Sequence, residues 1–493
     1  MTTDRVALPG AADDECVDCG YTPELKRTLS GFQIFAVSFA FISVAVGIFG
    51  TYDDLLKTAG PVGIWLWVVA AAGQTLVALV VAQFASRIAL SGSSYQWASR
   101  LASPKVGWLF GWLTFWYLAI AVVAMDNALA SQALMPLLGM SDDEDTARLI
   151  TVAVLIIQAV LVIASTRLLG LITSSAVGLE LGIVVLLVLA LGVVMLVTGD
   201  GNVDNLTSRG IAADSPDYFA VGGGLMAGMI MGLTTLVGFD SAANLAEEAK
   251  DPFRSVPRAI VASVVAAGVM GLVFLIALTA AIKNVTAVSR SGSPVALIIR
   301  DQLGSITERI LLAGIAFAMF GAGMVVLAAC SRQVFAMARD ARFPAHALMR
   351  QVNPRTQTPV PATILILIVG VVLMATLRGS ALIQLIIAST ILPALIYGAI
   401  VVLYLAVRKR LEHKEGGFGL GRFELPVAGI ALVWVAFALF VLVTPDSARV
   451  PGFIVLGLIA VGVAYFVKML VFNREVLDTE PGIDEFAATP ADR

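Results

Sequence analysis

The chain has 493 residues, of which 59% are apolar and only 14% are charged, and its mean hydropathy is +0.91. Soluble domains are about 45–50% apolar and about 25% charged, so this composition excludes a water-soluble fold. The net charge of −3, without a cluster of basic and aromatic residues, also excludes a nucleic-acid-binding protein. We therefore expect an all-α integral membrane protein that has the lipid bilayer, and no nucleic acid, as its partner.

Residues 1–29 are polar and acidic, and we interpret them as a cytoplasmic N-terminal tail. They lack a basic start followed by an apolar stretch, so a cleavable signal peptide is not expected. Cys16 and Cys19 form a single C-x-x-C in this tail. Metal or redox binding at these cysteines is one interpretation, and an ordinary tail sequence is the other. Because neither a second cysteine pair nor a nearby histidine accompanies them, no metal site or cofactor is predicted.

Apolar runs of about 18–28 residues follow one another along the rest of the chain, and each can cross a hydrocarbon layer of about 30 Å as a helix. They predict one twelve-helix membrane domain over residues 30–472 and a cytoplasmic C-terminal tail over residues 473–493. The predicted spans are residues 30–50, 62–84, 107–133, 149–165, 171–198, 221–246, 259–282, 310–331, 361–377, 381–405, 427–443 and 452–467.

The basic residues are distributed unequally between the loops. With the N-terminus in the cytoplasm, about 23 of the 32 Lys and Arg residues fall on the cytoplasmic side. This pattern predicts a multi-pass protein of the inner or plasma membrane with both termini in the cytoplasm. The largest basic groups follow spans eight and ten, where they serve orientation and contact with anionic lipid headgroups. The acidic segment 142–145 is predicted to be a solvated outer turn.

Two spans carry glycines at matching depths. Span one contains Ala45–Thr51, AVGIFGT, and span six contains Gly238–Ser241, GFDS. Glycine weakens a helix, and a break inside a membrane is tolerated only where the freed backbone groups are buried in protein or face a water-filled cavity. Paired breaks in two halves of a chain predict a binding site at the midplane of the membrane. The alternative is that these glycines allow close packing of helices.

Charged residues are rare within the predicted spans, where we find Asp126, Glu180 and Asp240 and no Lys or Arg. An ionised side chain at the bilayer centre costs about 2.5–3.5 kcal/mol or more, so such groups line a polar path, form a pair or hold a proton. Three acids without a basic partner suit a cationic cargo, a transported proton or both. For Asp126 the alternative is a protonated side chain that hydrogen-bonds a neighbouring helix. The aromatic residues of span three could stack on an amine or pack in the core.

Short motifs recur in a fixed order along these spans. They are Gly47-Ile48-Phe49, Tyr95-Gln96-Trp97-Ala98, Gly238-Phe239-Asp240-Ser241, Glu247-Glu248-Ala249-Lys250-Asp251-Pro252, Val256-Pro257-Arg258-Ala259-Ile260, Ser331-Arg332, Ala336-Met337-Ala338-Arg339-Asp340, Phe343-Pro344 and Thr358-Pro359. In these motifs the chain resembles the amino acid–polyamine–organocation (APC) transporter superfamily, and within it the amino acid/choline permeases. The similarity extends from about residue 30 to residue 467.

The resemblance implies a five-plus-five inverted repeat, the fold of the leucine transporter. The first repeat would comprise residues 30–198 and the second residues 221–405, followed by two extra helices in residues 427–472. Substrate would lie between broken helices one and six.

The resemblance also assigns roles to residues. A substrate carboxylate would face the amides near Ile48, Phe49 and Gly50, at a positive helix end, and carbonyls near Phe239 would accept from the amine. Phe239 resembles an aromatic gate over the substrate, and Asp240 occupies the position of a proton-responsive carboxylate. The full set of predicted substrate-binding residues is Gly47, Ile48, Phe49, Gly50, Gly238, Phe239, Asp240, Ser241 and Asp126.

The chain departs from the family pattern at two places. Relatives often have Gly-Ser-Gly where this chain has Ala45-Val46-Gly47, which makes a substrate without a carboxylate more credible. Many relatives have a lysine in helix five that stands in for a sodium ion, whereas this chain has Glu180. The middle of span eight, residues 318–326, also lacks the hydroxyl that a sodium site on this fold uses. We therefore expect proton coupling or exchange, with Glu180 and Asp240 as the residues that change protonation.

These observations predict a secondary active transporter, a permease for amino acids or small organic amines that works by alternating access. The alternatives are a transporter of a carboxylate-free cationic amine, such as choline, ethanolamine or a polyamine, and a nutrient sensor with the same fold that does not transport. An enzyme is not expected, because His346 and His413, the only histidines, lie in inner loops and no metal-binding spacing is present.

Overall fold

The computed structural model describes residues 25, 27–140, 143–291, 293–377, 380–411, 418–445 and 448–479, with the backbone alone for residues 380–386. Cys16 and Cys19, and with them most of the predicted N-terminal tail, lie outside the described residues. The described chain is helical throughout, and its isolated β-bridge joins Leu29 to Ala249. This agrees with the all-α fold predicted from composition.

Within the described residues, ten helices are long and apolar enough to cross a bilayer, and two shorter apolar helices, Gly224–Thr235 and Val360–Thr376, accompany them. Together they match the twelve predicted spans in order. The elements of these spans are α2 (Gly31–Ile42), α3 (Val44–Thr58), α4 (Leu66–Ala85), α6 (Pro104–Ala128), the π-helix η2 (Leu129–Leu134), α7 (Met135–Leu138), α8 (Glu144–Ala164), α9 (Thr166–Thr198), α10 (Gly224–Gly228), α11 (Ile230–Thr235), α12 (Ser241–Asn244), α13 (Pro252–Ala280), α16 (Ser305–Arg339), α18 (Val360–Thr376), α19 (Ser380–Val407), α20 (Glu424–Val443) and α21 (Arg449–Phe472).

Short helices connect the spans. They are η1 (Pro61–Trp65), α5 (Ser93–Leu101), η3 (Val203–Thr207), η4 (Gly210–Ala212), η5 (Ala246–Glu248), α14 (Val285–Ser289), α15 (Pro294–Leu303), α17 (His346–Met349), η6 (Arg408–Arg410), η7 (Gly421–Phe423) and α22 (Arg474–Asp478).

Several long helices begin at a side chain that satisfies their first free amides. Ser30 and Gln33 form a reciprocal capping box at the start of α2, and Ser103 caps α6. Asp143 caps α8, where its carboxylate accepts from the backbone and the hydroxyl of Thr146. These hydrogen bonds lower the pKa of Asp143. Part of the predicted acidic turn is therefore a helix cap.

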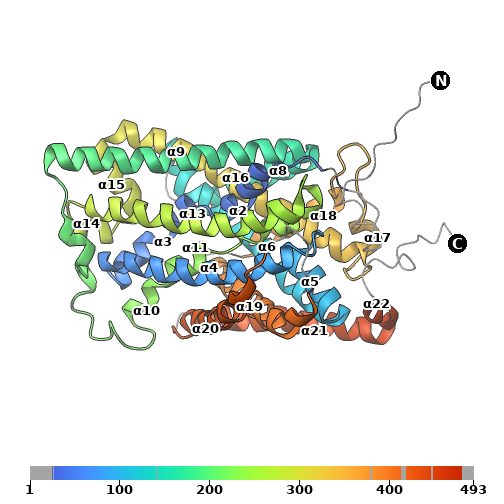
Figure 1. The fold of residues 1–493 in the computed structure, drawn as a ribbon. Helices are drawn as coiled ribbons and strands as arrows, with labels where there is room; N and C mark the ends of the chain where they lie inside the picture. The colour runs from blue at the N-terminus through green and yellow to red at the C-terminus, as the bar shows by residue number, and fades with distance from the viewer. Residues whose placement is uncertain are drawn as a thin grey trace, which may run out of the picture.

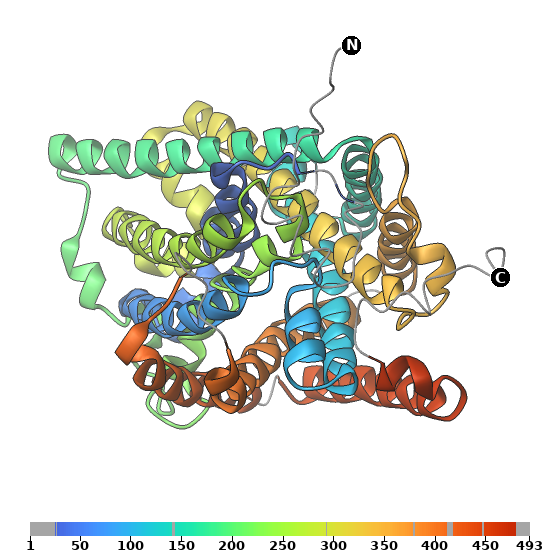
Figure 2. The ribbon, with the colours of Figure 1, turned by 45° about the vertical axis from the view of Figure 1, so that its right-hand side comes forward.

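The long helices lie side by side along one direction (Figures 1 and 2), with α9 on one face and α20 and α21 on the opposite face in both views. In Figure 1, α14 and α15 lie at one end of the bundle, and α17 and α22 lie at the other. Equivalent spans of the two predicted repeats pack on each other: α4 on α13, α6 on α16, and α8 on α18. This pairing is compatible with the predicted repeat.

The contact between α4 and α13 depends on small residues of α13. The Trp67 indole nitrogen on α4 donates to the carbonyl oxygen of Gly268 at 2.9 Å. A Cβ atom at Gly271 would lie 2.3 Å from the same indole, so glycine there makes room for the ring. The tryptophan thereby fastens α4 to the middle of α13.

The outer surface of the bundle is apolar. On α9, the side chains of Leu186, Leu189 and Val193 are each about 60% exposed, and no polar residue separates them. A contiguous apolar face of this kind is typical of a surface that meets lipid or another protein.

Candidate substrate site between two broken helices

The first span is interrupted at Ser43. α2 ends at Ile42, α3 begins at Val44, and Ser43 between them has a φ of 34°, in the left-handed region that favours glycine. The predicted position of the break, at Gly47–Gly50, is wrong, since these residues lie inside α3 and the Gly47 amide donates to the Ser43 carbonyl oxygen at 3.0 Å. The amides predicted to meet a carboxylate, at Ile48, Phe49 and Gly50, are therefore within the helix.

A carboxylate from a neighbouring span holds this break. Glu180, on α9, is 2% exposed and accepts from the Ala45 amide at 2.9 Å and from the Ser43 hydroxyl at 3.2 Å. Ala45 lies in the first turn of α3, where free amides and the helix dipole favour a negative group. Partners for the freed backbone, rather than a glycine, explain why the chain breaks at Ser43.

The sixth span is interrupted at Gly238, as predicted. Residues between α11 and α12 leave the helix, and Gly238 has a φ of +79°. Tyr397, on α19, holds this break, because its hydroxyl accepts from the Gly238 amide at 2.9 Å and donates to an oxygen of Asp240 at 2.8 Å. The two predicted site residues Gly238 and Asp240 are thus brought together by a tyrosine that the sequence analysis did not single out.

Phe239 is fully buried, and its ring stacks on Tyr397 at 4.7 Å between centroids. Its carbonyl oxygen accepts from the Ser38 hydroxyl at 2.6 Å, and the same Ser38 oxygen accepts from the Ala242 amide at 3.3 Å. Ser38 lies on α2, so these bonds join the first half of span one to the second half of span six. The expectation that Phe239 stands over the substrate does not fit this position.

A cavity of about 190 Å³ lies between the broken helices and α6. It is lined by Phe41, Ile42, Val46, Gly47, Gly50, Thr51, Tyr117, Ala121, Ala124, Met125, Ala128, Thr234, Thr235, Val237, Ser389 and Thr390. None of these side chains is charged. Hydroxyl groups supply its polar atoms, and the Tyr117 and Thr235 hydroxyls have no hydrogen-bond partner among the described residues.

Glycine has a packing role at both helices, as the alternative interpretation proposed. A Cβ atom at Gly47 would lie 2.1 Å from the Thr235 side chain, and one at Gly238 would lie 1.8 Å from the Phe41 ring. The two broken helices therefore touch at Gly47, immediately beside the cavity.

The structure separates the predicted site residues into two groups. Gly47 and Gly50 line the cavity, whereas Ile48, Phe49, Gly238, Phe239, Asp240, Ser241 and Asp126 do not. The lining hydroxyls that the sequence analysis missed had a signal in the sequence, because four of them form the pairs Thr234-Thr235 and Ser389-Thr390 in otherwise apolar spans. Of the aromatic residues of span three, Tyr117 lines the cavity, while Trp108 and Trp112 stack on Tyr465 of α21.

Asp126 does not line the cavity. It is fully buried, and one carboxylate oxygen accepts from the side-chain amide of Gln158 on α8 at 2.8 Å. That oxygen would lie 2.3 Å from a Cβ atom at Gly323 on α16. The position matches the alternative that Asp126 hydrogen-bonds a neighbouring helix.

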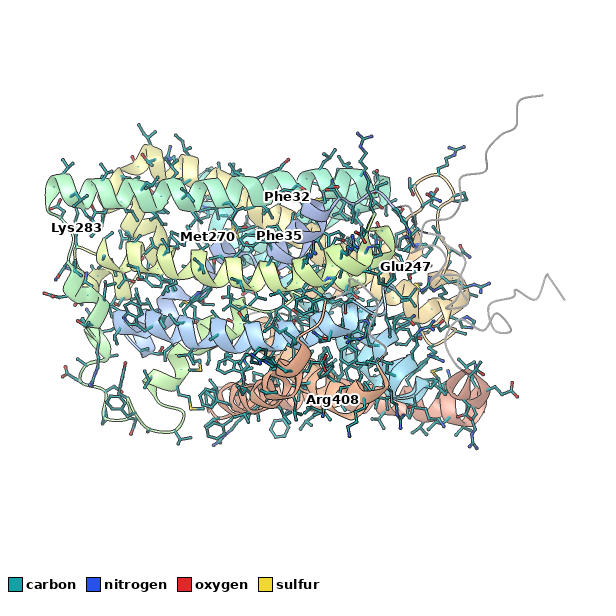
Figure 3. All side chains as sticks on the ribbon, in the orientation of Figure 1. Phe32, Phe35, Glu247, Met270, Lys283 and Arg408 are labelled. Atoms are coloured by element: carbon teal, nitrogen blue, oxygen red, sulfur yellow. The ribbon has the colours of Figure 1, made fainter. Side chains whose placement is uncertain are left out.

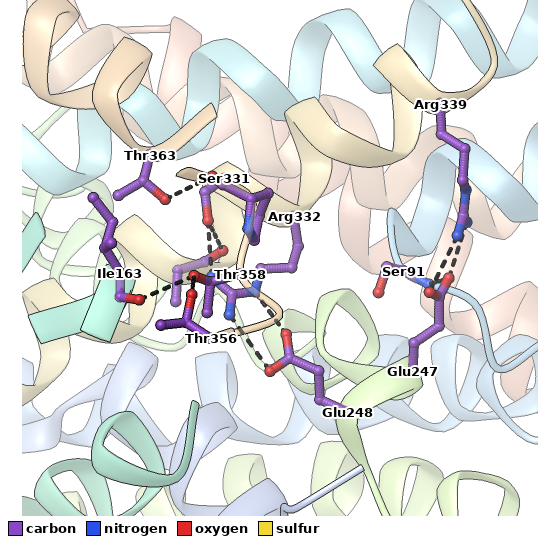
Figure 4. A network of polar contacts seen from close by, with 12 residues as sticks. Ser91, Ile163, Glu247, Glu248, Ser331, Arg332, Arg339, Thr356, Thr358 and Thr363 are labelled. Atoms are coloured by element: carbon purple, nitrogen blue, oxygen red, sulfur yellow. Dashed lines mark hydrogen bonds and ion pairs between the residues drawn. The ribbon is translucent and has the colours of Figure 1, made fainter. Parts of the chain in front are cut away.

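Two buried ion pairs join η5, which follows span six, to α16 of span eight (Figure 4). Arg332 lies 2.7 Å from Glu248, with both side chains inaccessible, and Arg339 lies 2.9 Å from Glu247. Glu247 also accepts from the Ser91 amide at 2.9 Å. The arginines belong to α16 and the glutamates to η5, so the two ion pairs join these elements.

A helical membrane bundle with a cavity between two interrupted helices is the architecture of a secondary transporter. The sequence model of the family described as amino acid permease matches residues 29–466. The chain belongs to this family and is a transporter rather than an enzyme.

Individual relatives match over most of their length. The chain is 27% identical to the amino-acid permease BAT1 of Arabidopsis thaliana, with 91% of this chain and 93% of the relative covered. It is 27% identical to the GABA-specific permease of Saccharomyces cerevisiae, with 86% and 76% covered. It is 26% identical to a putative polyamine transporter of Candida albicans, with 86% and 80% covered.

Proposed function

We propose that the chain carries a small amino acid or small organic amine across the cell membrane by alternating access, with both termini in the cytoplasm. The observation that carries this proposal is the uncharged cavity between the two broken helices. The relatives named as amino-acid, GABA and polyamine carriers lie within the same substrate range.

The size of the cavity favours a small solute. Pockets for drug-sized ligands are about 300–1,000 Å³, and this cavity is about 190 Å³. With no charged side chain in its lining, the charges of the solute would meet backbone groups and hydroxyls. Val46, in the first turn of α3, faces the cavity where the helix dipole is positive, and Thr234 and Thr235 lie where α11 ends.

A carboxylate-free amine is the second candidate, and Glu180 is the observation that favours it. The Glu180 carboxylate already accepts a hydrogen bond from the Ala45 amide at the positive end of α3. An ionised Glu180 would offset the positive potential that attracts a substrate carboxylate and would favour a cation.

Competition in proteoliposomes separates the two candidates. Serine and ethanolamine differ by a carboxylate, and each would be tested against uptake of the other. Stronger competition by serine supports the amino-acid proposal, and stronger competition by ethanolamine supports the amine. If no compound in a broad panel of amino acids and amines is taken up or competes for uptake, transport of either class is contradicted. A protein that binds a ligand but shows no counterflow would be a sensor.

We further propose that Glu180 and Asp240 change protonation during the cycle. Both contact the backbone breaks, Glu180 directly and Asp240 through Tyr397. Glu180→Gln and Asp240→Asn would be assayed with and without a pH gradient, and Asp126→Asn is the matched control, since Asp126 is an equally buried span acid that contacts neither break. Unchanged pH dependence in both test variants would contradict the role.

The repeat architecture is likewise proposed, with residues 30–198 and 221–405 as inverted halves of the twelve-helix transporter domain. Its support is that each half contains one interrupted span, at Ser43 and at Gly238, and that equivalent spans pack together. Alternating access would then move the broken helices against α6, α8, α16 and α18.

A further inference from the structure

A groove with a volume of about 580 Å³ lies between the beginnings of α2 and α13, apart from the substrate cavity. Its polar part contains Lys250, Arg254 and Arg258, with Asp251 as the acid among the lining residues. Its apolar part contains Phe35. The three basic side chains are exposed, and within the described residues none of them forms an ion pair.

We propose that this groove binds the headgroup of an anionic phospholipid. Three cations against one carboxylate give the groove a net positive charge that complements a phosphate. Arg254 and Arg258 are four residues apart, so they lie on the same side of α13, one turn apart. Arginine binds phosphate through two parallel N–H donors, which suits a lipid phosphate at this position.

The surface beside the groove fits an acyl chain. Continuing along α13 from Arg258, Val265 is 44% exposed and Val269 is 62% exposed on the same stripe of the helix. At about 1.5 Å per residue, this apolar stripe extends about 16 Å from the arginine. On the other wall, Phe32 is 54% exposed and lies with Phe35 on α2 (Figure 3), which packs between α9 and α13.

The change from cations to apolar residues along one helix is what selects a lipid over a soluble anion. A free phosphate would use the basic residues alone, whereas a phospholipid would occupy both parts of the groove. A bound lipid would also bridge α2 to α13 and so stabilise the first half of the broken span one.

The test measures thermal unfolding of the purified full-length protein in detergent as phosphatidylglycerol or phosphatidylcholine is added. Phosphatidylglycerol is expected to raise the unfolding temperature more than phosphatidylcholine does. Each arginine replaced by glutamine is expected to lower the apparent affinity for phosphatidylglycerol about five-fold, and Arg254→Gln/Arg258→Gln about thirty-fold. The matched control, Arg290→Gln/Arg309→Gln, removes two exposed cations outside the groove, one directly after α14 and one near the start of α16, and is expected to retain the affinity of the wild type.

The proposal would be overturned if both lipids raised the unfolding temperature of the wild type equally, or if the groove and control variants lost affinity for phosphatidylglycerol equally. It would also be overturned if glycerol phosphate, which has no acyl chains, raised the unfolding temperature as much as phosphatidylglycerol does, because the groove would then be a site for a soluble anion. The wild-type comparison of the two lipids needs no variant. Arg254→Lys/Arg258→Lys keeps both charges but loses the paired N–H donors, so its affinity for phosphatidylglycerol is expected to lie between those of the wild type and of the double glutamine variant.

Discussion

Replacing Glu180 tests whether a side chain of α9 sets the position of the break in span one. Glu180→Ala removes the acceptor of the Ala45 amide and of the Ser43 hydroxyl, both of which are buried. A hydrogen bond to a charged group contributes about 1.5–3 kcal/mol and one between neutral groups about 0.5–1.5 kcal/mol. Both bonds are accepted by the one carboxylate, so for an ionised Glu180 we expect the alanine variant to lose about 3–6 kcal/mol of unfolding free energy.

Glu180→Gln is the matched comparison, because its amide oxygen can still accept both hydrogen bonds. These two bonds would be neutral and roughly half as strong, so the expected loss is about 1.5–3 kcal/mol. Thermal unfolding of the three proteins in one detergent should rank the wild type first, glutamine second and alanine third. The reasoning would be refuted if alanine were as stable as the wild type, or if glutamine and alanine were equally destabilised.

Three further substitutions test packing at the breaks and the ion pair between α16 and η5. Gly47→Ala is expected to abolish proteoliposome uptake, because the new methyl group would lie 2.1 Å from a threonine side chain on α11; normal uptake would contradict this. Gly238→Ala is expected to lower the unfolding free energy by about 1–3 kcal/mol or more because φ is +79°, whereas Gly429→Ala, which meets nothing within 4 Å, should not. Arg332→Gln should cost about 3–5 kcal/mol by leaving Glu248 buried and unpaired, and a melting temperature equal to that of the wild type would disprove it.

The sequence predicted the helical class and the order of the spans well, because hydrocarbon thickness imposes a length on each apolar run. The position of the break in span six was also predicted correctly, because Gly238 combines a positive φ with close packing, which glycine alone permits without strain. The residues around Gly238 were therefore sufficient to predict the position of this break.

Span one was predicted less well, since its break depends on a residue 137 positions away. Ser43 leaves the helix where Glu180 can bind the freed groups, and nothing in residues 43–50 shows that partner. The glycine at Gly47 instead accommodates Thr235. In the same way, Tyr397 could not be assigned to the Gly238 break before the packing of α19 was known.

The indole that joins α4 to α13 has a mechanical consequence for a carrier. Since Trp67 fits against Gly271 and donates to Gly268, sliding of these two helices would require the ring to leave its slot and the donor to lose its acceptor inside an apolar interior. We therefore expect α4 and α13 to move together as one rigid unit. Displacement of either half of the broken span one, α2 or α3, which both pack on α13, would then move α4 as well.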